Sequence, residues 1–110
     1  MFVLNPGDVV SVTVSQTADG YISYQDRMAG GVSGYNAANL TPGSPIPVLA
    51  GQQESGLRSV MGAIIRNTSG ADNSVQVSLT FGSTTVLLYS GTLSAGQALA
   101  YGPTYGFVVR

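Results

Sequence analysis

The chain has 110 residues, a length typical of one domain, and 44% of them are hydrophobic, which favours a folded protein over a disordered one. It contains four arginines and five acidic residues but no lysine, histidine or cysteine, for a net charge of −1. These counts exclude disulfides and thiolate metal sites. They also argue against a nucleic-acid partner or a polybasic membrane patch, since both need clustered cationic residues.

The N-terminal segment gives no sign of export or membrane insertion. Residues 1–4 are followed at once by an Asn-Pro-Gly-Asp turn signal, so neither a basic region nor an apolar stretch of signal-peptide length is visible. No apolar run elsewhere approaches the ~20 residues that a membrane-spanning helix needs. We expect a protein that stays in the cytoplasm where it is made, free or assembled.

Residues 8–15 are predicted to form a half-buried strand, because valine alternates with serine and threonine along them. Residues 18–20 (Ala-Asp-Gly) are a turn signal, and residues 21–25 are predicted to form a second strand. The two strands are expected to pair as a β-hairpin.

Residues 26–56 are predicted to be a long irregular arm. The first part is rich in glycine, alanine and asparagine, and the second part contains three prolines. We find no helical period in the arm apart from a short turn near Ala37. Ile46–Ala50 is expected to be an edge strand, because proline is tolerated there. Long irregular segments in compact domains are usually either functional or linker-like, so the arm is a candidate contact region.

Residues 57–66 are predicted to form a central strand, because both faces of the segment are apolar in the middle. A loop of small, mostly polar residues follows at 67–73. One face of the strand is expected to carry Leu57, Met61, Ala63 and Ile65, and the other Val60, Gly62 and Ile64.

The clearest strand pattern lies in residues 75–81, where apolar and polar residues alternate. Gly82 and Ser83 are predicted to form a type II′ turn that leads into a paired strand. In that strand we expect Val86 and Leu88 on the inner face, and Leu87 and Tyr89 on the outer face.

Two further strands are predicted at 98–101 and 106–109, joined through Gly102-Pro103. The chain therefore contains seven or eight short strands separated by turn signals. This spacing predicts a single all-β domain over residues 1–110, a small antiparallel β-sandwich with the arm at 26–56. Jelly-roll and immunoglobulin-like topologies both remain open.

The sequence offers no catalytic arrangement. A nucleophilic serine needs a neighbouring base, and the chain has neither histidine nor lysine. A glycosidase-like carboxylate pair would have to come from Asp19, Asp26 and Glu54, but Asp19 and Asp72 are better explained as turn residues. Asp72-Asn73 lacks the alternating ligands of a calcium loop. We expect no enzymatic activity, cofactor, metal or small-molecule substrate.

Six tyrosines are many for a short chain without tryptophan. Tyrosine is favoured in sheets by propensity alone, and it is enriched at protein interfaces because it buries area and keeps a polar tip. Exposed tyrosines can also bind sugars. The tyrosines alone do not choose between these roles.

The C-terminal half carries a recognisable succession of segments. A strand beginning at Val60 ends in Asn67, and a small polar loop follows. Valine then alternates with polar residues along 75–79. Residues 88–99 then match the pattern Leu-x-x-Gly-x-Leu-x-Ala-Gly-x-x-Leu. This succession resembles small β-sandwich virion structural proteins of tailed bacteriophages, and it covers about half of the chain.

The resemblance implies a capsid decoration (cement) protein that binds the major capsid protein. It also allows a tail, collar or fibre-adaptor component. Such proteins are often oligomers, with trimers favoured, and they act in the virion after assembly in the host cytoplasm. The charge-poor surface fits this implication, because a surface with few charges is poorly protected against association unless partners cover it.

We expect the partner interface to involve the arm and the outer face of the strand after Gly82. Attachment should depend on shape and apolar burial, so salt should weaken it little. A carbohydrate-binding module is the alternative outside the phage particle. The candidate interface residues are Arg27, Met28, Tyr35 and Leu40 from the arm, and Leu87 and Tyr89 from the later strand.

Overall fold

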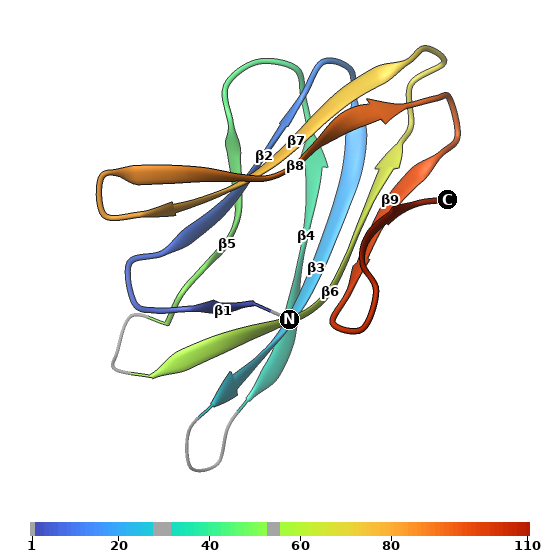
Figure 1. Ribbon diagram of the computed structural model, residues 1–110. Helices are drawn as coiled ribbons and strands as arrows, with labels where there is room; N and C mark the ends of the chain where they lie inside the picture. The colour runs from blue at the N-terminus through green and yellow to red at the C-terminus, as the bar shows by residue number, and fades with distance from the viewer. Residues whose placement is uncertain (1, 28–31, 53–55) are drawn as a thin grey trace.

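The computed structural model describes residues 2–27, 32–52 and 56–110 (Figure 1). These residues form ten strands in two antiparallel sheets and contain no helix, which confirms the predicted all-β sandwich. With no helix among them, the described residues include no helical segment that could cross a membrane.

The larger sheet, sheet A, has the strand order β10-β9-β6-β3-β4, and β1 pairs with β6 beside this path. The long strand β6 is central, as its two apolar faces predict, because β3 pairs along one side and β1 and β9 share the other. The strands of sheet A are β1 (Val3–Leu4), β3 (Ala18–Arg27), β4 (Ser33–Leu40), β6 (Leu57–Asn67), β9 (Ala98–Gly102) and β10 (Gly106–Val109).

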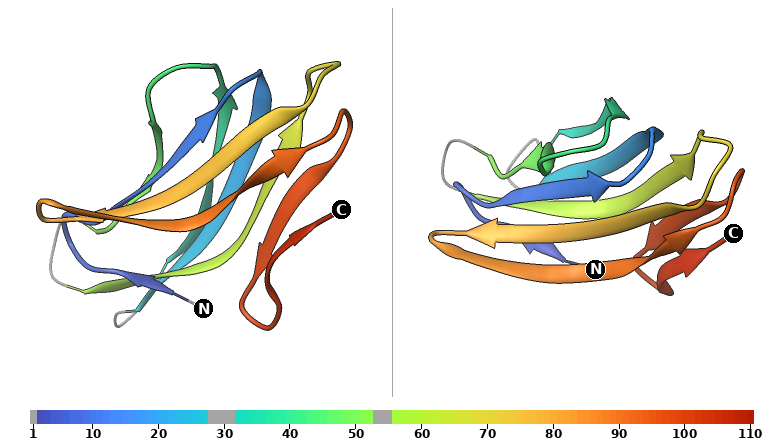
Figure 2. Two further views of the ribbon diagram at one scale, coloured as in Figure 1. Left: turned by 45° about the horizontal axis from the view of Figure 1, so that its top comes forward. Right: turned by 90° about the horizontal axis from the view of Figure 1, so that it is seen from above.

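The smaller sheet, sheet B, has the order β5-β2-β7-β8. The β7–β8 hairpin projects from one side of the molecule (Figures 1 and 2). Its turn has a φ of 60° at Gly82 and no positive φ at Ser83, as the predicted type II′ turn requires. The strands of sheet B are β2 (Val9–Val14), β5 (Ile46–Ala50), β7 (Asn73–Phe81) and β8 (Thr84–Leu93).

The core lies between the sheets and consists of the inward-facing residues, which alternate along the strands of both sheets. Burying each valine or leucine side chain there contributes about 1.5–3 kcal/mol. The most deeply buried hydrophobic residues are Leu4, Val10, Leu40, Leu49, Val60, Val75, Leu93 and Leu99.

Asn67 and Asn73 form a buried polar node at one end of the sandwich. The Asn73 amide donates to the carbonyls of Gln16 and Thr17 and to Asn67 Oδ1, and its own oxygen accepts the backbone N–H of Ser15 and Gln16. The Asn67 amide donates to carbonyls on two other loops, at Ala71, Leu93 and Ser94. The node therefore ties together the β2–β3, β6–β7 and β8–β9 connections.

The prediction that residues 26–56 form an irregular arm is wrong, because this part of the chain contains β4 and β5. β4 lacks a recognisable strand pattern since it is made largely of glycine, alanine and asparagine, and its pairing with β3 outweighs this low propensity. The short turn expected near Ala37 is replaced by extended strand. The edge strand predicted at Ile46–Ala50 is confirmed as β5, with Pro47 in it.

The hairpin predicted between residues 8 and 25 is also wrong. β2 belongs to sheet B and β3 to sheet A, so the chain crosses between the sheets there. The expected turn at residues 18–20 lies inside β3, which pairs with β4 and β6 along its length.

β-Bulges change which side chains face the core. One lies in β5 at Val48, and two more lie in the longer strands β6 and β8. The register of β3 with β6 shifts at Ser23/Tyr24, which leaves Met61 as an extra residue and turns Val60 inward, where it is fully buried. The register of β7 with β8 shifts at Val77/Ser78, opposite the extra residue Leu88. In both strands, strict alternation predicts the wrong face on one side of the bulge.

Candidate partner-binding face

An apolar row crosses the outer face of sheet A. Tyr21 of β3 pairs with Ala37 of β4 on one side and with Ile64 of β6 on the other. Ile64 pairs in turn with Ala100 of β9, and Ala100 with Val108 of β10. The row is therefore continuous over five strands. We call these five residues the apolar row: Ala37, Tyr21, Ile64, Ala100 and Val108.

The row faces away from the core because side chains alternate along each strand. The neighbours of the row along each strand are buried between the sheets, as Ile22, Ile65 and Leu99 show. The side chains of Tyr21 and Ile64 are 43% and 47% exposed. Large hydrophobic residues that are adjacent and half exposed usually mark a contact surface.

Two tyrosines form a stacked pair at one end of this face. The rings of Tyr21 and Tyr35 lie 5.3 Å apart between centroids, with 26° between their planes. Tyr35 is 64% exposed, so the pair offers a broad aromatic surface to a partner. The diagonal placement of the two residues on neighbouring strands β3 and β4 brings the rings together.

A third tyrosine covers the opposite end of the face. The ring of Tyr105 lies over Gly102, at a position where any side chain would collide with it. The Arg110 guanidinium lies 5.5 Å from the centre of the same ring. The residues at positions 62, 98 and 102 of this face are small: Gly62, Ala98 and Gly102.

The charges on this face are few. Asp19 and Arg66 lie directly opposite one another on β3 and β6, in the row next to the apolar row, and both are exposed. Arg110 adds a positive charge beside Tyr105. So small a charge gives little electrostatic preference for a partner. Contact through this face would therefore depend on apolar burial.

The outer face of sheet B is different in chemistry. It presents hydroxyl and amide side chains such as Thr13, Gln76 and Ser90, which lie side by side on β2, β7 and β8. The four strands of sheet B contain no charged residue. The two outer faces of the sandwich are therefore unlike, one apolar and aromatic and the other largely polar and uncharged.

The candidate interface residues from the N-terminal half are dispersed by the fold. Tyr35 lies on the outer face of sheet A, and Arg27 is exposed at the end of β3. Met28 lies outside the described residues. Leu40 is wrong as a contact residue, because it ends β4 with its side chain in the core and is only 1% exposed.

Leu87 and Tyr89 do not share a face. Leu87 pairs with Ser78 on the outer side of sheet B and is 54% exposed. Tyr89 follows the bulge, pairs with the buried Val77, and places its ring 5.6 Å from that of Phe107. Tyr89 therefore belongs to the space between the sheets, and the predicted outer-face pair is wrong.

Sequence reasoning missed Tyr21, Ile64 and Val108. The available signal was the apolar character of both faces in residues 57–66, which predicts a strand buried on both sides. In the structure one of those faces is open to solvent at Ile64. The pairing of Ile64 with Tyr21 depends on strand register, which the sequence does not specify.

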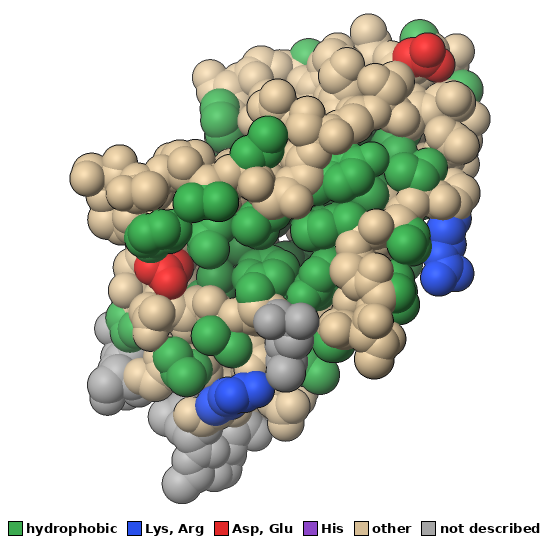
Figure 3. Space-filling model, viewed as in Figure 1, with side chains coloured by type: hydrophobic (Ala, Val, Ile, Leu, Met, Phe, Trp, Pro, Cys, Tyr) green, Lys and Arg blue, Asp and Glu red, His purple; other side chains and the backbone are tan. Residues whose placement is uncertain are grey.

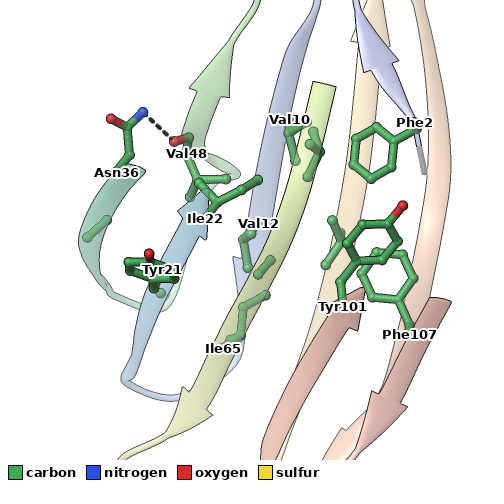
Figure 4. Close-up of a pocket in the computed structure, with 15 residues that line it drawn as sticks. Phe2, Val10, Val12, Tyr21, Ile22, Asn36, Val48, Ile65, Tyr101 and Phe107 are labelled. Atoms are coloured by element: carbon green, nitrogen blue, oxygen red, sulfur yellow. Dashed lines mark hydrogen bonds between the residues drawn. The ribbon is translucent and has the colours of Figure 1, made fainter. Parts of the chain in front are cut away.

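The space between the sheets is a core rather than a ligand site. Apolar side chains, among them Val12, Ile22, Tyr101 and Phe107, line a cavity of about 30 Å³ there (Figure 4). This is room for little more than one water molecule, and a cavity with apolar walls stays dry. Burial raises the pKa of Tyr101, and a hydrogen bond with the Phe2 backbone opposes this shift.

The acidic residues considered for catalysis are not brought together. Asp26 makes a two-pronged ion pair with Arg58, at 2.7 Å to Nε and 3.1 Å to Nη2, and this bond raises the pKa of Arg58. Asp19 is seven residues away on the same strand, a separation of about 23 Å. Glu54 lies outside the described residues. No group of three metal-ligating side chains occurs in the described ranges.

Comparison with known proteins gives no relative from which a role could be transferred. No protein-family model, no curated protein and no solved structure matches the chain significantly.

Proposed function

We propose that this protein is a structural component of a bacteriophage particle, and specifically a capsid decoration (cement) protein. In this role it binds the major capsid protein through the outer face of sheet A and stabilises the head as a homo-oligomer. It acts in the virion, which is assembled in the host cytoplasm.

The apolar row is the observation that carries the proposal. It is a strip without charged side chains over five strands, in which Tyr21 and Ile64 are substantially exposed, and the exposed Tyr35 stacks on Tyr21 beside it. Apolar faces with aromatic anchors suit shape-complementary contact with another protein surface. The resemblance of the C-terminal half to phage virion proteins directs the proposal to a particle.

The proposal predicts that the double substitution Tyr21→Ser with Ile64→Ser weakens attachment to phage heads. Removing two central apolar anchors should raise the dissociation constant about 10- to 100-fold. Co-sedimentation of the purified protein with heads that lack it measures the effect. Raising the salt concentration should change binding of the unmodified protein less than about 3-fold, because few charges contribute.

Phe81→Ser is the matched control for this experiment. Phe81 is exposed to the same degree as Tyr21 but lies at the tip of the β7–β8 hairpin, in the other sheet. It should leave attachment unchanged. Equal binding by the double variant and the control would contradict the role of the apolar row, and a steep loss with salt would contradict apolar attachment.

Two further measurements separate the proposal from its alternatives. A labelled antibody that marks the tail, collar or fibre base would replace the decoration role with a tail-associated one. A glycan array tests the carbohydrate-binding alternative, for which the exposed Tyr21–Tyr35 pair would be the sugar platform. Specific glycan binding that is lost on Tyr35→Ser, without any particle binding, would overturn the proposal.

A further inference from the structure

The strand β8 is an open edge with few of the features that normally protect one. In the described part of the chain, β8 pairs with β7 alone. Natural edge strands are shielded by charged residues, proline, short length or β-bulges. β8 has the bulge at Leu88, but it is ten residues long, contains no charge and no proline, and includes three threonines, a valine and a tyrosine, which favour sheet pairing.

The other edges of the two sheets are better protected. β5 contains Pro47, and β10 has only four residues and is followed by Arg110. β4 is built from residues of low strand propensity, and its Asn36 amide donates to the Val48 carbonyl of β5. Sheet pairing with another chain is therefore most favourable at β8.

An apolar opening between the sheets lies beside this edge. Hydrophobic side chains gather around a hollow beneath β8 in the space-filling view (Figure 3). Tyr89 of β8 and Phe107 of β10 are in contact across the opening, and Phe107 lies 4.9 Å from the ring of Tyr101. Phe2, Tyr101 and Phe107 are grouped together on one side of the interior (Figure 4).

We propose that β8 is a self-association edge, and that a second copy of the chain pairs its own β8 antiparallel to it. A two-fold axis perpendicular to sheet B relates two such strands, so the inner faces of both copies lie on the same side. The paired strands make one eight-stranded sheet, and the apolar opening of each copy faces that of the other.

Because the β8 edge carries no charge, a second copy of the same chain is the partner that fits it best. Residues 73–109 contain no charged side chain, so two identical edges meet without repulsion, and a partner that carries charge gains nothing there. The exposed side chains of Val86 and Leu87 also become buried in the pair. This inference is independent of the proposed attachment to a capsid, because it concerns the isolated protein.

The solution mass of the purified protein tests the proposal. Light scattering after size-exclusion chromatography should give twice the 11.2 kDa of one chain. Leu87→Lys places a like charge on the edge strand of each copy and should raise the dimer dissociation constant about 10-fold or more. Amide hydrogens of residues 84–93 should exchange faster in this variant than in the unmodified protein.

Gln76→Lys is the matched control, because it adds the same charge to the same outer face on the interior strand β7. It should leave the dimer intact. Thr85→Lys provides a second edge variant if Leu87→Lys does not fold. A monomeric unmodified protein overturns the proposal, as does a mass of three chains or equal behaviour of the edge variants and the control. Capsid attachment by a monomer would leave the proposed binding to the capsid standing and would remove only its homo-oligomeric form.

Discussion

Several buried polar side chains among the described residues are held by specific partners, whereas Ser59 is not. Asp26 is bound by Arg58, whose guanidinium also lies 4.0 Å from the Tyr24 ring. Asn73, fully buried, uses both ends of its amide. Among the described residues, the Ser59 hydroxyl is the buried side-chain group without a hydrogen-bond partner. An unsatisfied buried hydroxyl costs free energy because it loses its bonds to water.

Ser59→Ala is therefore expected to increase the free energy of unfolding by about 1 kcal/mol. Urea unfolding followed by circular dichroism measures the change. Ser69→Ala is the matched control, since the Ser69 hydroxyl lies 2.7 Å from Asn67 Oδ1 and its removal should destabilise the protein. A loss of stability in both variants would show that the Ser59 hydroxyl is satisfied.

Among the secondary-structure elements, the sequence predicts the strands and turns that are determined by neighbouring residues. Residues 75–81 and the Gly82-Ser83 turn are correctly predicted because alternation and turn chemistry lie within a few neighbouring residues. β4 is missed because its residues form a strand only through pairing with β3. The bulges at Met61 and Leu88 are missed because they depend on register between strands.

The candidate face shows the same limit. Tyr35 is found from its residue type, and its neighbour Tyr21 is not selected, because only the β3–β4 register stacks the two rings. Leu40 lies two positions before Pro42 and looks like part of a loop in the sequence. In the structure it is the buried last residue of β4.

The asparagine node predicts a large effect at the scale of connected elements. Asn73→Ala leaves the carbonyls of Gln16 and Thr17 and the N–H of Ser15 without their partner, and we expect a loss of about 3 kcal/mol in the free energy of unfolding. Denaturant unfolding checks this value. Asn36→Ala removes one exposed bond to Val48 and should cost less than about 1 kcal/mol. Similar losses would contradict the node.

At the scale of the whole molecule, stability at alkaline pH depends on Tyr101. Its ring packs between the sheets against Phe2 and Phe107, and burial raises the pKa of its hydroxyl above the usual 10. Because the unfolded chain loses this proton at lower pH than the folded protein, the stabilising contribution is complete below about pH 10 and is lost as the pH rises through the folded pKa.

Tyr101→Phe should therefore flatten the fall in the free energy of unfolding above about pH 10, although the variant loses its bond with the Phe2 backbone. Unfolding curves at a series of pH values on both sides of 10 test this. An equally steep alkaline fall in the variant and the unmodified protein would show that Tyr101 does not control it.

The path of the chain between the two sheets has a consequence for synthesis on the ribosome. β1 pairs with β6, and β2 with β5 and β7, so β1 has no partner, and β2 has only its edge partner β5, until the second half of the chain has emerged. Contacts this distant in sequence form slowly, because much of the chain must be ordered first. The sandwich is therefore expected to close only late in translation, with the valine-rich N-terminal segment accessible to chaperones in the meantime.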